Sequence, residues 1–208
     1  MKIVVFGAAG RVGSKVVELL LAEGHEVVAC VHSNDPFESQ PNLRVVKLDV
    51  HNAVKVAEVI SGSQVILSAV SNWGSKDGDV LTAAMRAVVP AMKQAGVRRI
   101  ISLTGNAAFT PDDKPTAIQR ANRTMLQKLA PKVLKDGEKH MAVLRNSGLD
   151  WTVLRSPVMN ELGGQGYVLR EKLSGPTATI HRQAVAQAMV DQISDTKWLQ
   201  KTPVIWRQ

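Results

Sequence analysis

The sequence predicts an α/β protein built on a doubly wound parallel sheet, and two observations carry this prediction. Short apolar runs rich in β-branched residues alternate along the chain with longer segments of helical periodicity. Gly24 and Gly96 each stand between the end of a helical segment and the start of the next apolar run, as C-terminal caps do. Such an alternation of strand and helix builds a parallel sheet with helices on both faces. The 208 residues suffice for one such domain.

The expected elements follow from these runs in chain order. The expected strands are residues 2–6, 26–31, 43–48, 64–67, 98–103 and 151–154. The expected helices are residues 12–22, 53–60, 79–95 and 124–145, and the expected loops are residues 109–115 and 161–166. After Leu173 we expect a short extended piece, then a helix that starts near His181 and a last strand within residues 201–206. We expect one domain over residues 1–208, in which residues 157–208 contribute a small lobe on the substrate side.

Composition and charge narrow the classes of function. No apolar run is long enough to span a bilayer or to serve as a signal peptide, so we expect a cytoplasmic protein without a membrane partner. The net charge is +8, but the cations are scattered and no aromatic residues are interleaved with them. We therefore expect a solvated basic surface and no nucleic-acid partner. Cys30 lies in an apolar run, as a core side chain would, and the oligomeric state is not indicated.

The run GAAGRVG joins the first strand to the first helix. Gly7 turns the chain, Gly10 leaves room for a pyrophosphate, and Gly13 lets the helix pack on the strand. The start of the helix offers free N–H groups and a positive dipole end to phosphates. We expect the cofactor to contact the loop between these glycines, namely Ala9, Arg11 and Val12. A tight turn that uses glycines for structure alone is the alternative reading.

The GxxGxxG spacing resembles the extended and atypical short-chain dehydrogenase/reductase superfamily. LDV at residues 48–50 and LSAVS at residues 67–71 are similar to its cofactor-lining stretches. Residues 92–104 and 143–157 are similar to the NmrA-like and flavin reductase (biliverdin IXβ reductase-like) subgroups. The resemblance implies a Rossmann-like fold that binds NAD(P). It also implies cofactor contacts at four further residues: Asp49, Val50, Ala69 and Val70.

The end of the second strand favours NADP over NAD, although NAD is possible. An acidic residue there would hold the ribose hydroxyls of NAD, but the chain has His32 and Ser33, and Asp35 comes late. Arg11 and His32 are candidates to face the 2′-phosphate, with Ser33 and Asn34 as hydrogen-bond donors beside them. The flavin reductase-like proteins usually carry an arginine at the place of His32. The alternative is that both side chains are simply solvated.

The Tyr-x-x-x-Lys signature of the larger superfamily is absent, because the only tyrosine, Tyr167, lacks the following lysine and comes too late in the chain. Lys139 and His140 occupy the corresponding helix, and we interpret both as surface residues, with the alternative that His140 reaches the pocket. Thr104 and Asn106 follow the fifth strand and are the candidate catalytic residues. A strand-end hydrogen bond to the backbone is an equal alternative for them.

A planar acceptor would stack on an apolar platform. Trp73, Phe109 and Met159 follow the fourth, fifth and sixth strands and are the candidates for the substrate pocket, while Pro157 is expected beside the cofactor. The histidines show no metal-ligand spacing, so no metal is expected. We therefore expect a reductase that passes a hydride from NAD(P)H to a planar small molecule such as a flavin or quinone. An NmrA-like sensor that binds NADP without turnover is the alternative, and an epimerase or dehydratase is disfavoured.

Overall fold

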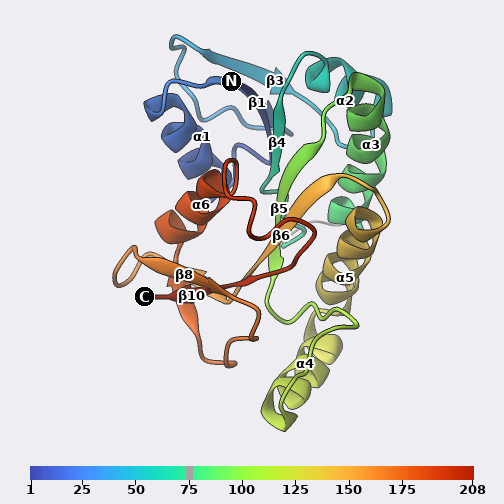
Figure 1. The fold of residues 1–208 in the computed structure, drawn as a ribbon, viewed down its shortest axis with the longest axis vertical. Coiled ribbons are helices and arrows are strands. Elements are labelled where there is room, and N and C mark those ends of the chain that lie inside the picture. The colour runs from blue at the N-terminus through green and yellow to red at the C-terminus, as the bar shows by residue number, and fades with distance from the viewer. Residues whose placement is uncertain (74–76) are drawn as a thin grey trace.

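The computed structural model of the protein describes residues 1–73 and 77–208, and they form a twisted sheet with helices on both faces (Figure 1). The strand order is β3-β2-β1-β4-β5-β6-β10-β8, and all neighbours are parallel except β8, which runs antiparallel to β10. The strands of this sheet are β1 (Lys2–Phe6), β2 (Glu26–Val31), β3 (Leu43–Lys47), β4 (Val65–Ser68), β5 (Arg99–Gly105), β6 (Asp150–Ser156), β8 (Tyr167–Arg170) and β10 (Val204–Arg207). The predicted fold class is confirmed.

Two apolar cores lie on opposite faces of the sheet. Helices α1 (Gly13–Ala22) and α6 (Arg182–Asp191) cover one face, and α2 (Ala53–Ile60), α3 (Val80–Ala95) and α5 (Pro131–Arg145) cover the other (Figure 1). Successive residues of a strand enter opposite cores: Val5 packs under α1, and Val4 packs toward α2. Strands buried on both faces are apolar at every position, which explains the unbroken apolar runs of the sequence.

The helix predicted over residues 124–145 is wrong, because two helices occupy this part of the chain. α4 (Ala117–Leu129) begins seven residues earlier than expected, at a capping box in which Thr116 and Gln119 each accept the other's backbone N–H. Pro131 is the first residue of α5. A proline ring disfavours helical geometry in the residue before it, and Ala130 is accordingly non-helical at φ −141° and ψ 57°. The break therefore follows from Pro131.

The C-terminal residues 157–208 contribute to the main sheet as well as to a smaller one. β10 and β8 extend the main sheet beyond β6, and α6 packs against α1. β7 (Val158–Asn160) and β9 (Thr179–His181) form a separate parallel pair. The helix expected near His181 and the expected last strand are both present. The short extended piece expected before this helix is β9, whereas β7 and β8 were not predicted. The role of this region on the substrate side stays a prediction.

Candidate functional site

The carboxyl ends of the parallel strands lie at one edge of the sheet. Most of the predicted site residues directly follow these strand ends. The strand order reverses between β1 and β4, so the loops after these two strands meet at that edge. Gly7 ends β1 with φ +73°, and a Cβ on it would lie 2.7 Å from the backbone nitrogen of Val70 and 2.8 Å from the carbonyl oxygen of Ala69. The two predicted loops are therefore in contact, and only glycine fits at residue 7.

The other two glycines of the loop have different surroundings. A Cβ on Gly13 would lie 2.1 Å from the Gly7 carbonyl oxygen, so residue 13 must be glycine for α1 to pack on the loop. Gly10 is exposed, and only the Gly7 carbonyl oxygen, at 3.2 Å, approaches the position of its Cβ. Gly7 and Gly13 thus shape the turn, while Gly10 leaves its outer side bare.

This turn has the chemistry of an anion site. Among the described residues, the backbone N–H groups of Ala9, Arg11 and Val12 have no acceptor, and they stand where α1 begins. Unpaired N–H groups and the positive end of a helix dipole together favour a phosphate. The bare side of Gly10 and these free donors fit the pyrophosphate of a dinucleotide.

No carboxylate directly follows β2, where an acidic residue would bind the ribose of NAD. His32 and Ser33 are exposed there. The first acid, Asp35, accepts the backbone N–H of Phe37 at 3.0 Å and is held in its own turn. Arg11 is exposed on the glycine loop, where its guanidinium can reach solvent. These surroundings are compatible with the predicted preference for a 2′-phosphate.

Asp49, which follows β3, forms an exposed pair with His51 that sequence reasoning missed. The carboxylate accepts the backbone N–H of His51 at 2.9 Å and its Nδ1–H at 2.8 Å. These hydrogen bonds lower the pKa of Asp49, and the bond to Asp49 raises the pKa of His51. The next residue, Val50, is half-buried and packs against the core beneath α2 and α3. The pair therefore fixes the direction of the Asp49 carboxylate.

The residues predicted for the nicotinamide end are closely packed. Thr104 is 9% exposed, and a Cβ on Gly137 of α5 would lie 2.6 Å from its Oγ1. Asn106 donates its backbone N–H to Ser156 at 2.8 Å, next to the buried Pro157, and its Nδ2 to the Ser174 carbonyl at 3.2 Å. The loop after β5 is therefore tied to β6 and to the loop after β8. Asn106 makes the backbone hydrogen bonds that were the alternative to a catalytic role.

The three aromatic and apolar candidates for the platform lie in different surroundings. Trp73 is 69% exposed in the loop after β4. Phe109 lies under the guanidinium of Arg123, whose carbon is 5.3 Å from the ring centre. Met159 sits in β7 and packs against the core beneath α1 and α6. A shared stacking platform of these residues stays a prediction.

His140 is buried, so its interpretation as a surface residue is wrong, whereas Lys139 is exposed as expected. The Nδ1–H of His140 donates to the Gly137 carbonyl at 2.9 Å, and the Ser102 hydroxyl donates to the Nε2 of His140 at 3.2 Å. Burial lowers the pKa of His140 to about 4, so the ring is neutral at pH 7. The burial of His140 could have been predicted from its position four residues before Leu144, on the buried face of α5.

Asp136 is a second buried group that sequence reasoning missed. Its carboxylate accepts the N–H groups of Leu81 and Thr82, each at 2.9 Å, and the Thr82 hydroxyl at 2.6 Å. It also accepts Asn72 Nδ2 at 2.9 Å, from the loop after β4. One side chain of α5 thus caps the start of α3 and fixes a loop at the edge of the sheet.

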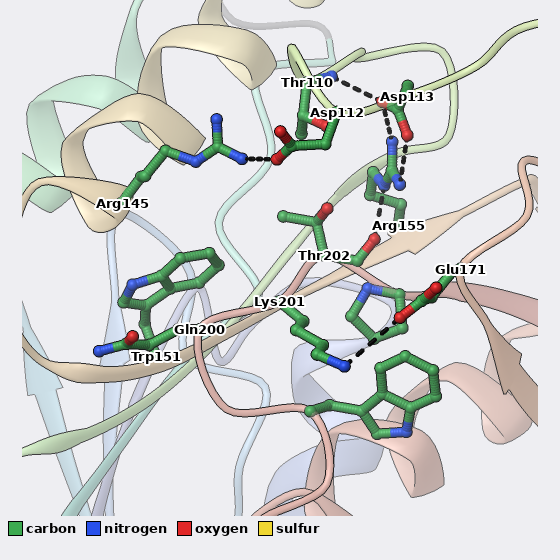
Figure 2. Close-up of a pocket in the computed structure, with 12 residues that line it drawn as sticks. Thr110, Asp112, Asp113, Arg145, Trp151, Arg155, Glu171, Gln200, Lys201 and Thr202 are labelled. Atoms are coloured by element: carbon green, nitrogen blue, oxygen red, sulfur yellow. Dashed lines mark hydrogen bonds and ion pairs between the residues drawn. The ribbon is translucent and has the colours of Figure 1, made fainter.

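A buried ion pair lies near the carboxyl end of β6. Arg155 of β6, 2% exposed, donates to both carboxylate oxygens of Asp113 at 2.6 and 2.9 Å (Figure 2). A cavity of about 250 Å³ lies beside the pair, and its charged lining residues also pair with one another: Arg145 with Asp112, and Lys201 with Glu171. No predicted site residue lines this cavity, so it is separate from the glycine loop.

The glycine turn, its free N–H groups and its place at the switch point of the sheet define a dinucleotide-binding protein of the Rossmann type. The model of the NAD(P)H-binding family matches residues 7–196, and the chain belongs to this family. A nicotinamide cofactor is therefore supported. The matched residues include the glycine turn and all of the predicted cofactor contacts.

Comparison with known proteins supports the assignment of the fold. The chain is 26% identical over 219 residues to an uncharacterised chloroplastic protein of Arabidopsis thaliana, covering 96% of this chain and 72% of that protein. A short-chain dehydrogenase/reductase from Veillonella parvula, solved in complex with NADP, superimposes with a TM-score of 0.81 at 18% identity, covering 99% and 94% of the two chains. ChuY, an anaerobilin reductase from Escherichia coli O157:H7, gives 0.77 at 20% identity, covering 100% and 97%. The resemblance to short-chain dehydrogenases/reductases is confirmed for the fold.

Proposed function

We propose that the protein is an NADPH-dependent reductase of a planar acceptor such as a flavin or a quinone. The observation that carries the proposal is the glycine turn: Gly10 is bare, and the N–H groups of Ala9, Arg11 and Val12 are without acceptors among the described residues. This turn would hold the pyrophosphate, and Arg11 with His32 would face the 2′-phosphate. The bound nicotinamide would supply a hydride to the acceptor. The NADP-bound relative and the reductase relative both support the proposal.

The chain's own part in this reaction is to position the reactants rather than to transfer a proton. Tyr167 donates its hydroxyl to Asp191, and burial together with this bond raises its pKa, so it does not act as an acid at the edge. His140 is buried and neutral. Thr104 and Asn106 are polar but carry no ionisable proton. A flavin or quinone can take its proton from water, so a holder of this kind is sufficient.

The alternative, an NADP sensor without turnover, is favoured by one observation. Asn106, a candidate catalytic residue, is engaged with the Ser174 and Ser156 backbone in a packed loop. A sensor would bind the cofactor through the same glycine turn and would need no group for an acceptor. Turnover is therefore what separates the two functions.

The test follows NADPH oxidation at the nicotinamide absorbance band with FMN or a quinone as acceptor. We expect turnover, and we expect Gly10→Trp to abolish both turnover and NADPH binding, because the indole would occupy the bare side of the turn. Ala22→Trp adds the same ring at the other, exposed end of α1 and is the matched control. Tight NADPH binding without turnover on any acceptor would support the sensor instead.

A further inference from the structure

Helix α4 carries an apolar face that nothing covers in the described parts of the chain. It is the most strongly amphipathic of the described helices, yet none of its residues is buried. Ile118, Met125 and Leu129 follow one another at spacings of seven and four residues, so they lie on one face. They are 63%, 51% and 74% exposed. In Figure 1, α4 projects from the lower end of the molecule, beyond the edge of the sheet.

A different face of α4 attaches the helix to the rest of the protein. Gln119 donates its Nε2 to the carbonyls of Leu173 and Ser174 at 3.0 and 3.2 Å. Arg123, one turn later, pairs with Glu138 of α5 at 2.5 Å. These contacts hold the helix in place and leave the face of Ile118, Met125 and Leu129 outward. The apolar face is thus presented by a held helix.

The charges in α4 and the residues next to it in sequence are of one sign. Residues 114–135 contain six cations and no acidic residue: Lys114, Arg120, Arg123, Lys128, Lys132 and Lys135. Among the described residues, only Arg123 of these six has an acidic partner. These unpaired cations favour an anionic partner. A second copy of the same surface would carry the same charge and would be repelled.

Although the sequence predicted no membrane partner, we propose that α4 binds the surface of an anionic lipid bilayer. The three apolar side chains would enter the boundary between headgroups and acyl chains, Lys128 next to Leu129 would contact lipid phosphates, and the other unpaired cations would add to the attraction. A nucleic acid would use the cations but not the apolar face. No helix of the described residues is long and apolar enough to cross a membrane, and this mode of binding requires none. The inference goes beyond the proposed reductase function and does not depend on it.

Sedimentation with vesicles tests the proposal. The full chain should bind vesicles that contain phosphatidylglycerol and not vesicles of phosphatidylcholine alone, and added salt should weaken the binding. Leu129→Ser should weaken it roughly tenfold, because one leucine no longer leaves water. Lys128→Gln should weaken it by about fivefold, whereas Arg120→Gln should weaken it less, because Arg120 lies on the opposite side of the helix from Ile118. All three residues are exposed, so the variants should fold, which circular dichroism checks.

Matched controls separate α4 from general surface properties. Val54→Ser replaces an apolar residue of α2 that is 70% exposed, and Arg86→Gln with Lys93→Gln removes two exposed cations of α3. Both should bind vesicles as the unaltered chain does. Equal binding to both vesicle types would overturn the proposal, as would Leu129→Ser variants that bind unchanged. The same holds if Leu129→Ser turns a dimer into a monomer in gel filtration, because the apolar face then contacts a second copy. NADPH turnover is assayed separately on each variant.

Discussion

At the residue scale, the three glycines of the run GAAGRVG have different roles. Gly7 and Gly13 are fixed by contacts below 3 Å that any Cβ would make, whereas Gly10 is bare. The sequence pattern predicts all three glycines but does not separate the packing roles from the open one. The difference depends on which backbone atoms lie opposite each residue: Ala69 and Val70, after β4, lie opposite Gly7, and Gly7 and Ala8 lie opposite Gly13.

Arg11 is the residue whose replacement tests the cofactor preference. Its guanidinium is exposed on the glycine loop and would make a charge-assisted hydrogen bond with a 2′-phosphate. Arg11→Gln should raise the Kd for NADPH about tenfold and leave the Kd for NADH unchanged. Isothermal titration with both cofactors measures this. Equal losses for NADPH and NADH would show that Arg11 contacts a part common to both cofactors.

His140 should make the stability of the protein depend on pH. Its pKa is about 4 in the folded protein, against an ordinary value of 6.5, so the unfolded chain binds more protons between these values. Its stabilising contribution is complete above pH 6.5 and falls as the pH drops toward 4, by up to about 3 kcal/mol. Urea unfolding across this range should show the slope, and His140→Gln should reduce it. An unchanged slope in the variant would contradict this assignment.

Most elements, but not all, could be predicted from the sequence. Strands β1, β2, β4, β5 and β6 are mostly apolar because they are buried on both faces, and this pattern is local. Two features depend on more than local pattern. The early start of α4 depends on a capping box in a polar stretch, and β8 is a half-buried edge strand of four residues, too short to stand out. Asp136 and His140 were missed because burial of a polar residue depends on partners distant in sequence.

Asp136 connects three elements, and its removal should destabilise the whole protein. In Asp136→Ala, the N–H groups of Leu81 and Thr82 and the amide of Asn72 lose their acceptor in a buried place. We expect a loss of about 3 kcal/mol in the free energy of unfolding, measured by urea denaturation. Lys135→Ala, at the exposed neighbouring position, should change it by less than about 0.5 kcal/mol. Similar values for the two variants would refute the role of Asp136.

The cap of α4 should control the opening of that helix alone. Thr116→Ala removes the hydroxyl that accepts the Gln119 N–H and should cost about 1 kcal/mol locally. Because α4 has no buried residue, this loss should not spread to the core. Hydrogen exchange should become about fivefold faster in residues 117–129 and stay unchanged in β1 and β5. Faster exchange throughout the sheet would show that α4 is coupled to the core.

At the scale of the whole molecule, one edge of the sheet collects the glycine turn, the Asp49–His51 pair and the loops tied by Asp136 and Asn106. The opposite faces are filled by two apolar cores that hold the strands in register. The scaffold thus places the groups that would bind a dinucleotide on rigid strand ends. Among the predicted site residues that the structure describes, Asp49 is the one carboxylic acid, and it is hydrogen-bonded to His51. The proposed reaction therefore depends on the positioning of the nicotinamide against the acceptor.

The most direct measurement uses NADPH that carries deuterium on one face of the nicotinamide C4, with FMN or a quinone as acceptor. If the protein positions the cofactor against the acceptor, deuterium should leave from one face only, so that one labelled stereoisomer gives unlabelled NADP⁺ and the other retains the label. Mass spectrometry of the NADP⁺ reads the result. Loss from both faces equally, or binding without any oxidation of NADPH, would contradict the reductase.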